Sequence, residues 1–174
     1  MLQMSAAQLQ QICDHAQRTY PDECCGLLLG QLDPSHERKD LVEVWETLNV
    51  WSAEEMELIA PTASASENSH SKADRYCIDP RDLLEAQRYG RDRQLDVIGV
   101  YHSHPDHPAV PSECDRAIAW LRYSYLIISV EKGRAIDHRS WSLNDHHQFQ
   151  PEELTLLDPA SPQNLKFKIS ADLL

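Results

Sequence analysis

The apolar residues of this chain recur with two periods, one typical of α-helices and the other typical of β-strands. After Ser5, helical spacing predicts a helix over residues 5–17 with Ser5 as its N-cap. The apolar face of this helix consists of Leu9, Ile12, Cys13 and Ala16. A second helix is predicted from Asp79 to about residue 91, because Asp79 is a favourable cap and Pro80 suits the first helical position.

Short apolar runs bounded by turn residues predict strands. They lie at 25–29, 41–48, 95–103, 123–130 and 135–143. Residues 131–134 have the composition of a hairpin turn between the last two runs. A third helix is predicted over 113–121 with Ser112 as its cap. Strands that alternate with helices in this way predict an α/β or α+β fold, in which a sheet is flanked by helices.

Two segments show weaker patterns. Residues 61–75 are rich in Ser, Ala and Asn, so we expect a mobile loop there. Near the C-terminus, three apolar residues alternate with lysines and predict a short edge strand. These residues are Leu165, Phe167 and Ile169.

Composition narrows the class of protein. The 174 residues are 41% apolar and 25% charged, which is ordinary for one compact domain. The 16 basic and 28 acidic residues give a net charge of −12 without a basic run, so we expect no nucleic acid partner. No apolar run approaches the ~20 residues that span a bilayer, and the N-terminus lacks the pattern of a signal peptide. Five cysteines, an odd number, favour reduced thiols, and we expect a cytoplasmic protein without a membrane partner.

The most informative polar positions lie where the strand at 95–103 ends. Side chains alternate faces along a strand, so His102 and His104 point the same way. Asp115 follows in the first turn of the helix that Ser112 caps. In a plain capping box its carboxylate would turn back to the amide of the cap. Here we expect the carboxylate to reach a metal instead.

These three side chains form the donor set of a catalytic zinc site. Two imidazoles and one carboxylate leave the fourth corner of the zinc tetrahedron for water. Pro105 is expected to end the regular strand pairing. An isolated His-x-His pair is most often a surface or core feature, and Ser-x-x-Asp alone is most often a helix start, but their combination is more specific. Nitrogen and oxygen ligands also bind other divalent metals.

The run His-Ser-His-Pro at 102–105, followed by Pro-Ser-x-x-Asp at 111–115, resembles the JAMM motif of the MPN+ (Mov34/PAD-1-like) metalloproteases. The resemblance implies zinc as cofactor and the MPN/JAMM fold, a mixed curved sheet of the cytidine-deaminase-like type, over 1–149. It leaves 150–174 as a C-terminal extension. It is closest to compact prokaryotic members that act near ubiquitin-like sulfur-carrier proteins.

The resemblance also implies roles for two further residues. The run 20–30 resembles the segment that carries the family's catalytic glutamate, which corresponds to Glu23. Ser112 is expected to donate a hydrogen bond to the oxyanion of the tetrahedral intermediate. Without the family context, Glu23 would read as a solvated loop carboxylate and Ser112 as a helix cap only.

The reaction implied is hydrolysis of an amide or isopeptide bond after the C-terminal Gly-Gly of a ubiquitin-like or sulfur-carrier protein. Metal-activated water would attack, with Glu23 as general base. The leaving group would be a cysteine adduct or a lysine side chain.

Two other classes of function stay open. One is a non-catalytic MPN scaffold that binds partners, although such domains typically lack the ligands. The other is a zinc hydrolase of a small-molecule amide; a deaminase of this kind expects Pro-Cys-x-x-Cys, which the sequence lacks. Weaker candidates for chemistry are a loop histidine, a turn with two histidines, and three thiols that could modulate activity: His107, residues 145–147, Cys24, Cys25 and Cys114.

Overall fold

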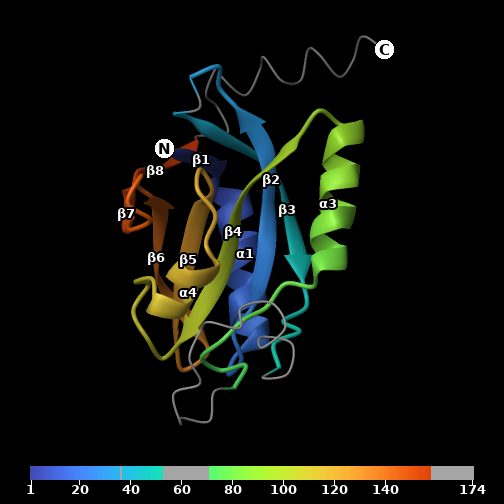
Figure 1. Cartoon of the computed structure of the whole chain (residues 1–174). Helices are drawn as coiled ribbons and strands as arrows, with labels where there is room; N and C mark the ends of the chain where they lie inside the picture. The colour runs from blue at the N-terminus through green and yellow to red at the C-terminus, as the bar shows by residue number, and fades with distance from the viewer. Residues whose placement is uncertain (36, 53–70, 158–174) are drawn as a thin grey trace.

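The computed structural model describes residues 1–35, 37–52 and 71–157. In that part of the chain, eight strands form one sheet with the order β7-β6-β5-β4-β2-β3-β1-β8 (Figure 1). The strands are β1 (Leu2–Ser5), β2 (Cys25–Leu32), β3 (Lys39–Thr47), β4 (Asp96–Pro105), β5 (Ser124–Glu131), β6 (Arg134–Leu143), β7 (Phe149–Glu152) and β8 (Leu154–Leu157). The helices are α1 (Ala6–Thr19), α3 (Pro80–Asp92) and α4 (Glu113–Ile118).

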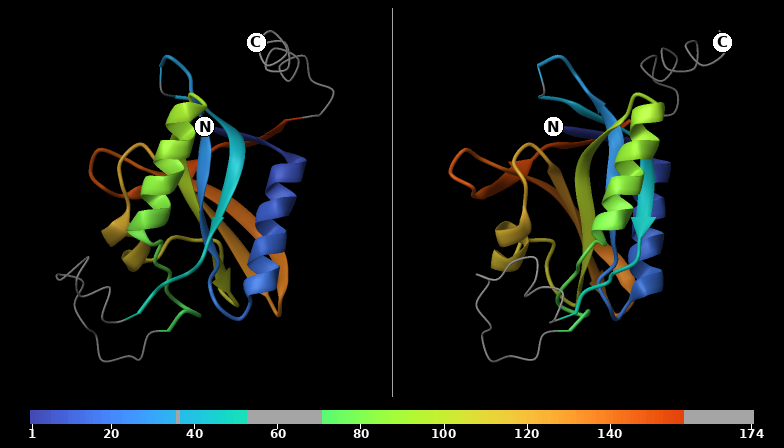
Figure 2. Two further views of the ribbon diagram at one scale, coloured as in Figure 1. Left: turned by 90° about the vertical axis from the view of Figure 1, so that its right-hand side faces the viewer. Right: turned by 45° about the vertical axis from the view of Figure 1, so that its right-hand side comes forward.

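The sheet is mixed and curved. The pairs β2–β3, β2–β4, β5–β6 and β6–β7 are antiparallel, whereas β4–β5, β1–β3 and β1–β8 are parallel. Figure 2 shows α1 and α3 on opposite sides of this sheet. The predicted class, a mixed sheet flanked by helices, is confirmed.

Each face of the sheet has its own apolar core, because neighbouring side chains of a strand point to opposite faces. Leu28 and Tyr101 belong to the core that α1 covers. Leu27 and Val100 belong to the core that contains Ala86 of α3. The strands that carry both cores, β2 and β4, lie in the middle of the sheet. The rigid centre of the fold therefore holds the strand with the two histidines.

The predicted starts of the helices are confirmed. Ser5 caps α1 through a complete capping box, and the Asp79 side chain accepts from the amide of Arg81 at the start of α3. The hairpin between β5 and β6 turns at Lys132 and Gly133, whose φ angles are +48° and +79°. Consecutive positive φ angles are typical of the tight turns that connect antiparallel strands.

Two boundaries near the histidines differ from the predictions. Strand β4 continues two residues beyond residue 103, and Pro105, its last residue, pairs in register with Val130. Helix α4 ends at Ile118 rather than residue 121, because Ala119 is extended (φ −77°, ψ 143°). The next amide, of Trp120, donates to the hydroxyl of Tyr125 at 2.6 Å instead of continuing the helix.

Three strands were not predicted, because they are only four residues long and lie at the edges of the sheet or beside an edge strand. Strand β1 lies between β3 and β8, and β7 and β8 are the two edges. Residues 150–157, which the resemblance assigned to an extension, therefore take part in the sheet. The predicted strand at 165–169, and residues 61–70 of the predicted loop, lie outside the described residues.

Candidate metal centre

The two histidines occupy neighbouring positions on one face of β4. Val100, His102 and His104 alternate with Tyr101 and Ser103, as the period of a strand requires. Val100 belongs to the core on the α3 side, so both imidazoles face the side of the sheet that α3 and α4 cover. Both histidines are buried.

Asp115 is brought to this face by the first turn of α4. Its carboxylate oxygens lie 3.3 Å from Nε2 of His102 and 3.6 Å from Nε2 of His104, and the two Nε2 atoms are 3.0 Å apart. In a zinc tetrahedron with bonds of ~2.0–2.1 Å, neighbouring ligand atoms lie about 3.3 Å apart. The contacts, two of which end on different oxygens of Asp115, are close to this spacing, and one potential ligand atom from each residue lies within 4.8 Å of the other two.

Asp115 also closes the capping box of α4. The amide of Ser112 donates to its Oδ2 at 2.6 Å, and the amide of Asp115 donates to Oγ of Ser112 at 3.1 Å. The expectation that Asp115 leaves the cap in order to reach a metal is wrong. A carboxylate has about four acceptor sites, so one side chain can serve both the cap and the histidines. The cap fixes the rotamer of Asp115 and points its oxygens at the imidazoles.

Protonation states suit a metal ligand set. Burial raises the pKa of Asp115, but the adjacent His102 and His104 outweigh burial and hold that pKa well below the usual range. Burial lowers the pKa of His102, which favours the neutral imidazole. Metals bind neutral imidazole and ionised carboxylate.

The rings of both histidines are held by neighbours. Nδ1 of His104 lies 2.8 Å from the carbonyl oxygen of Pro108, a hydrogen bond that leaves Nε2 free to act as a ligand. The ring of His102 stacks on Tyr76 with a centroid distance of 4.3 Å and an angle of 24° between the planes. Nδ1 of His102 is buried, and no partner for it is found among the described residues. Packing against Tyr76 therefore orients this ring.

Glu23 lies beside this cluster, just before β2, and only 5% of its surface is exposed. Burial, followed by the negative charge of Asp115, raises the pKa of Glu23 to about 9. A cation bound between the histidines and Asp115 would offset part of that charge and lower the pKa again. A buried carboxyl group with a raised pKa can both accept and return a proton near neutral pH.

A half-buried amide, Asn49, holds the backbone next to Glu23. Its Nδ2 donates to the carbonyl oxygens of Glu23 (3.0 Å) and Arg75 (2.9 Å). Its Oδ1 accepts from the amides of Trp51 (3.0 Å) and Cys77 (3.1 Å). Three of these bonds join the segment of Glu23 to the segment that carries Tyr76, and the bond from Trp51 is local to Asn49. We had not singled out Asn49, because the sequence shows only a polar residue after a strand.

Ser103 anchors the other side of the same segment. Its Oγ accepts from the amide of Cys24 at 2.8 Å, and its own amide donates to the carbonyl oxygen of Cys24 at 3.2 Å. The residue between the two histidines therefore ties β4 to the residue after Glu23. Strand alternation turns Ser103 away from the two histidines, towards Cys24.

The weaker candidates do not join this cluster. Within the described residues, His102, His104 and Asp115 form the one group of potential metal ligands. His107 is exposed, and Nε2 of His147 lies 3.0 Å from the carbonyl oxygen of Arg116. Burial raises the pKa of Cys24 and of Cys25 to about 12, so neither thiol is ready to act as a nucleophile.

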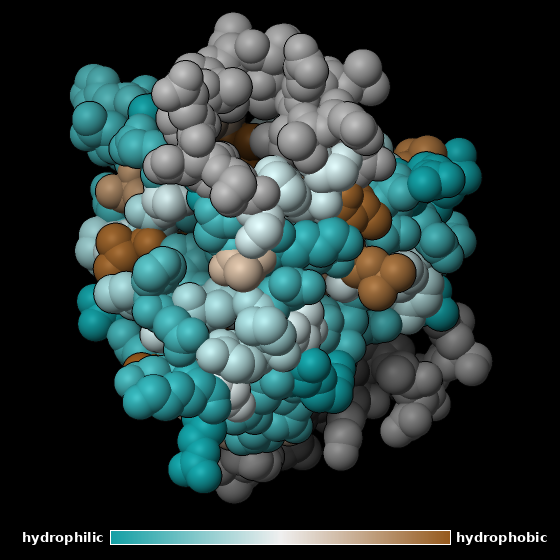
Figure 3. Space-filling view, turned by 90° about the horizontal axis from the view of Figure 1, so that it is seen from below, coloured by the Kyte–Doolittle hydropathy of each residue, from teal (hydrophilic) through white to brown (hydrophobic). Residues whose placement is uncertain are grey.

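The surface at this end of the molecule is mainly polar. Figure 3 looks onto the end of the sheet at which β4 finishes, and single hydrophobic residues there are separated by hydrophilic ones. None of the described helices is long and apolar enough to cross a membrane.

Residues 5–144, most of the chain, match the family of prokaryotic homologues of the JAB domain. The chain belongs to this family. The motif at 102–115 is thus confirmed as that of a prokaryotic JAMM/MPN protein. Among solved structures, proteins of Desulfitobacterium hafniense and Salinibacter ruber share the fold, with TM-scores of 0.70 and 0.63 and identities of 26% and 29%. Each match covers more than nine-tenths of both chains.

A JAB1/MPN domain protein of Archaeoglobus fulgidus is similar in fold alone, with a TM-score of 0.51 and 16% identity over 91% of this chain and 98% of that one. Two curated relatives are similar over shorter segments. A probable TtuB-protein conjugate cleaving protease of Thermus thermophilus is 34% identical over 92 residues, 52% of this chain and 60% of that protein. A desampylase of Haloferax volcanii is 43% identical over 67 residues, 36% and 45% of the two chains. The matches thus span between about half and six-tenths of these relatives.

Proposed function

We propose that this protein is a zinc-dependent peptidase that cleaves an amide or isopeptide bond at the C-terminus of a ubiquitin-like or sulfur-carrier protein. The observation that carries the proposal is the cluster of His102, His104 and Asp115: the two Nε2 atoms lie 3.0 Å apart, Oδ1 of Asp115 lies 3.3 Å from Nε2 of His102, and Oδ2 lies 3.6 Å from Nε2 of His104. The names of the two curated relatives support the substrate class, since both refer to cleavage of protein conjugates or of sampylated proteins.

Three side chains, those of His102, His104 and Asp115, would hold the metal and leave its fourth position for water. Bound there, a zinc ion would polarise the scissile carbonyl and make a water molecule nucleophilic near neutral pH. An imidazole that binds a metal carries no charge, so only Asp115 would offset the charge of the ion. The site retains net positive charge and therefore its Lewis acidity.

Glu23 is the proposed general base and acid. Its carboxylate takes a proton from the attacking water and delivers a proton to the nitrogen of the leaving amine. Burial suits this exchange because it raises the pKa of Glu23 towards the pH at which the reaction runs. Asn49 and Ser103 both hold the peptide group that joins Glu23 to Cys24, so little reorientation is needed when substrate binds.

Ser112 is the proposed donor to the oxyanion. Its side chain is exposed at the start of α4, and its Oγ already accepts from the amide of Asp115. A hydroxyl that accepts from the backbone still has its proton to donate. The two roles of Ser112, helix cap and oxyanion donor, are thus compatible. Where such donors have been removed, about 3 kcal/mol of transition-state stabilisation was lost.

The substrate we propose ends in Gly-Gly. Glycines have no side chain, so an extended tail can pass close to the walls of a narrow site. The leaving group would be a cysteine adduct or a lysine side chain, and we place the reaction in the cytoplasm, where the five free cysteines would remain reduced.

The test combines metal content with cleavage. The zinc-loaded protein should release the C-terminal adduct from a Gly-Gly carrier protein, read by mass spectrometry. Glu23→Gln should retain zinc and lose most turnover, whereas His104→Ala should lose zinc. Zinc binding without cleavage of any Gly-Gly substrate would instead support a non-catalytic scaffold, and full activity of Glu23→Gln would remove Glu23 from the mechanism.

A further inference from the structure

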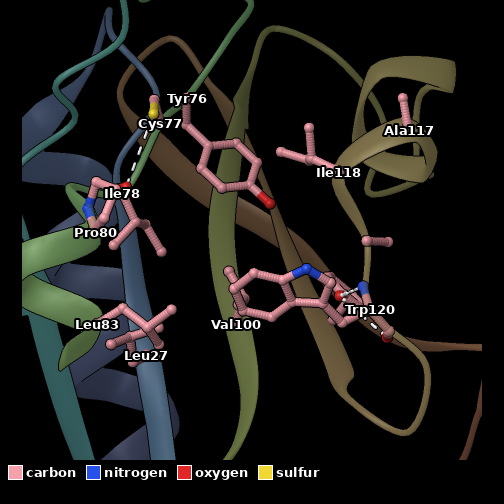
Figure 4. A pocket seen from close by; sticks show the side chains of 12 residues that line it. Leu27, Tyr76, Cys77, Ile78, Pro80, Leu83, Val100, Ala117, Ile118 and Trp120 are labelled. Atoms are coloured by element: carbon pink, nitrogen blue, oxygen red, sulfur yellow. Dashed lines mark hydrogen bonds between the residues drawn. The ribbon is translucent and has the colours of Figure 1, made fainter. Parts of the chain in front are cut away.

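A cavity lies on the same face of the sheet as the metal centre, beyond the ring of Tyr76. Its volume is about 350 Å³, in the lower part of the ~300–1,000 Å³ range of ligand pockets. It lies between α3, the segment after α4, and strands β2, β4 and β5 (Figure 4). Its lining includes Leu27, Tyr76, Leu83, Val100, Trp120 and Tyr125.

The strand register shows that residues lining this pocket lie two positions along the strands from the proposed metal ligand His102. Leu27 and Tyr125 pair with Val100, and the next pair of residues on that face of β2 and β4 is Cys25 with His102. Two residues along a strand span about 7 Å. Val100, which lines the pocket, therefore lies about 7 Å along β4 from His102, on the same face of the sheet.

Tyr76 separates the pocket from the metal centre and presents a hydroxyl to the pocket. One face of its ring stacks on His102, and the residue is 6% exposed. Figure 4 shows the hydroxyl pointing into the space between Ile118, Val100 and Trp120. It makes no hydrogen bond to any residue in the described part of the chain. A hydroxyl without a partner in the described part of the chain has its proton free to donate to a ligand with a hydrogen-bond acceptor.

The mouth of the pocket is open. Trp120 is 50% exposed, and Pro80 and Ala117 on the rim are also exposed. An accessible indole beside an apolar cavity is typical of the anchors at binding sites. The pocket therefore combines an apolar interior, an aromatic rim and one polar group at the end nearest the metal centre.

We propose that this pocket takes the apolar side chain of the residue directly before the Gly-Gly of the substrate, and that Tyr76 donates its hydroxyl to a backbone carbonyl of the same tail. The inference rests on the proposed function. In an extended chain, residues two apart point to the same side and lie about 7 Å apart. With the last glycine at the metal centre, the third residue from the scissile bond lies over the pocket.

Short peptides test this selectivity. Acetyl-Ala-Ala-X-Gly-Gly coumarin amides, with X as Leu, Ala or Asp, are incubated with the zinc-loaded protein. Leu should exceed Ala by about tenfold or more in kcat/KM, because a pocket gains that much from each methylene group it is built to hold. Asp should be the poorest substrate. Equal rates for the three peptides would overturn the inference and leave the proposed function intact, whereas cleavage of none would count against the proposed function.

A matched pair of variants locates the selectivity in this pocket. Leu83→Trp should fill the cavity from α3 and bring the preference for Leu over Ala close to one. Leu84→Trp adds the same side chain at the next position, which is 46% exposed and does not line the pocket, and should keep the preference. Thermal melting of both variants checks that they are folded. Loss of the preference in Leu84→Trp as well, or in neither variant, would contradict the assignment.

The affinity for a product peptide measures the contribution of the Tyr76 hydroxyl to binding, independently of catalysis. Calorimetry of the zinc-loaded protein with the product acetyl-Ala-Ala-Leu-Gly-Gly should show about fivefold weaker binding for Tyr76→Phe, the loss of one hydrogen bond. Tyr89→Phe, which loses a hydroxyl bonded to Glu43 on the surface, should bind as the wild type does. Equal affinity of Tyr76→Phe and wild type would refute the donor role.

Discussion

If the proposed function holds, replacement of Asn49 by Ala should slow cleavage without touching a proposed metal ligand. The variant loses the four hydrogen bonds of the Asn49 side chain, three of which reach the segments of Glu23 and Tyr76. The backbone of Glu23 then has fewer constraints, although its amide still donates to the carbonyl oxygen of Lys72. Asn49→Asp is an equally informative change, because it turns the donor that faces two carbonyl oxygens into an acceptor.

The size of the effect follows from the bonds. At ~0.5–1.5 kcal/mol each, the four bonds bound the loss of stability at about 2–6 kcal/mol. Asn49 is half-buried, so water replaces part of this, and we expect the free energy of unfolding to fall by about 2–3 kcal/mol. A displacement of about 1 Å in a reacting group costs on the order of 100-fold in rate. The kcat should therefore fall between about tenfold and 100-fold while KM changes little.

Urea unfolding and steady-state kinetics measure the two effects separately. Asn144→Ala is the matched control, because Oδ1 of Asn144 also accepts from two backbone amides, those of His146 and Gln148, in a turn far along the chain from Glu23. It should lose stability but keep kcat. The reasoning is refuted if Asn49→Ala retains the kcat of the wild type, or if Asn144→Ala loses kcat to the same degree.

Three further outcomes are expected. In the metal-free protein, the pKa of Glu23 is raised from its usual 4.5 to about 9, so the folded state binds the proton more tightly and the free energy of unfolding should fall as the pH rises from 4.5 towards 9. Glu23→Gln should remove much of that slope in urea unfolding; an unchanged slope would contradict it. Lys39→Met should lower the free energy of unfolding by about 1.5–3 kcal/mol, because the buried carboxylate of Glu152 loses the ammonium 3.3 Å away and keeps the N-terminal ammonium at 3.4 Å; Lys39→Met/Glu152→Leu should recover most of the loss. With pKa values raised to about 12, Cys24 and Cys25 should stay unmodified by iodoacetamide at pH 8 in the native protein and react only after unfolding; rapid native labelling, seen by mass spectrometry, would disagree.

The sequence predicted the parts of the site that follow from local rules. The period of a strand placed His102 and His104 on one face, and the cap at Ser112 placed Asp115 in the first turn of α4. The same rules found both long helices and the central strands. They depend on residues close together in the chain.

The remaining features depend on contacts between distant segments. Asn49 acts through Glu23 and Arg75, each 26 residues away, and no local pattern distinguishes it from an ordinary polar residue. Tyr76 gains its place from stacking on His102. Strands β1, β7 and β8 are short, and they form because their partners in the sheet lie nearby in space. Asp115 both caps α4 and contacts the histidines, and the local sequence pattern predicts only one of these roles at a time.

X-ray absorption at the zinc edge of the metal-loaded protein tests the central claim most directly. Two imidazole nitrogens and a carboxylate oxygen at about 2.0–2.1 Å, with no sulfur, are expected, and the signal should disappear in His104→Ala prepared in the same way. Sulfur at about 2.3 Å, or an unchanged zinc signal in His104→Ala, would contradict the assignment of His102, His104 and Asp115 as the metal centre.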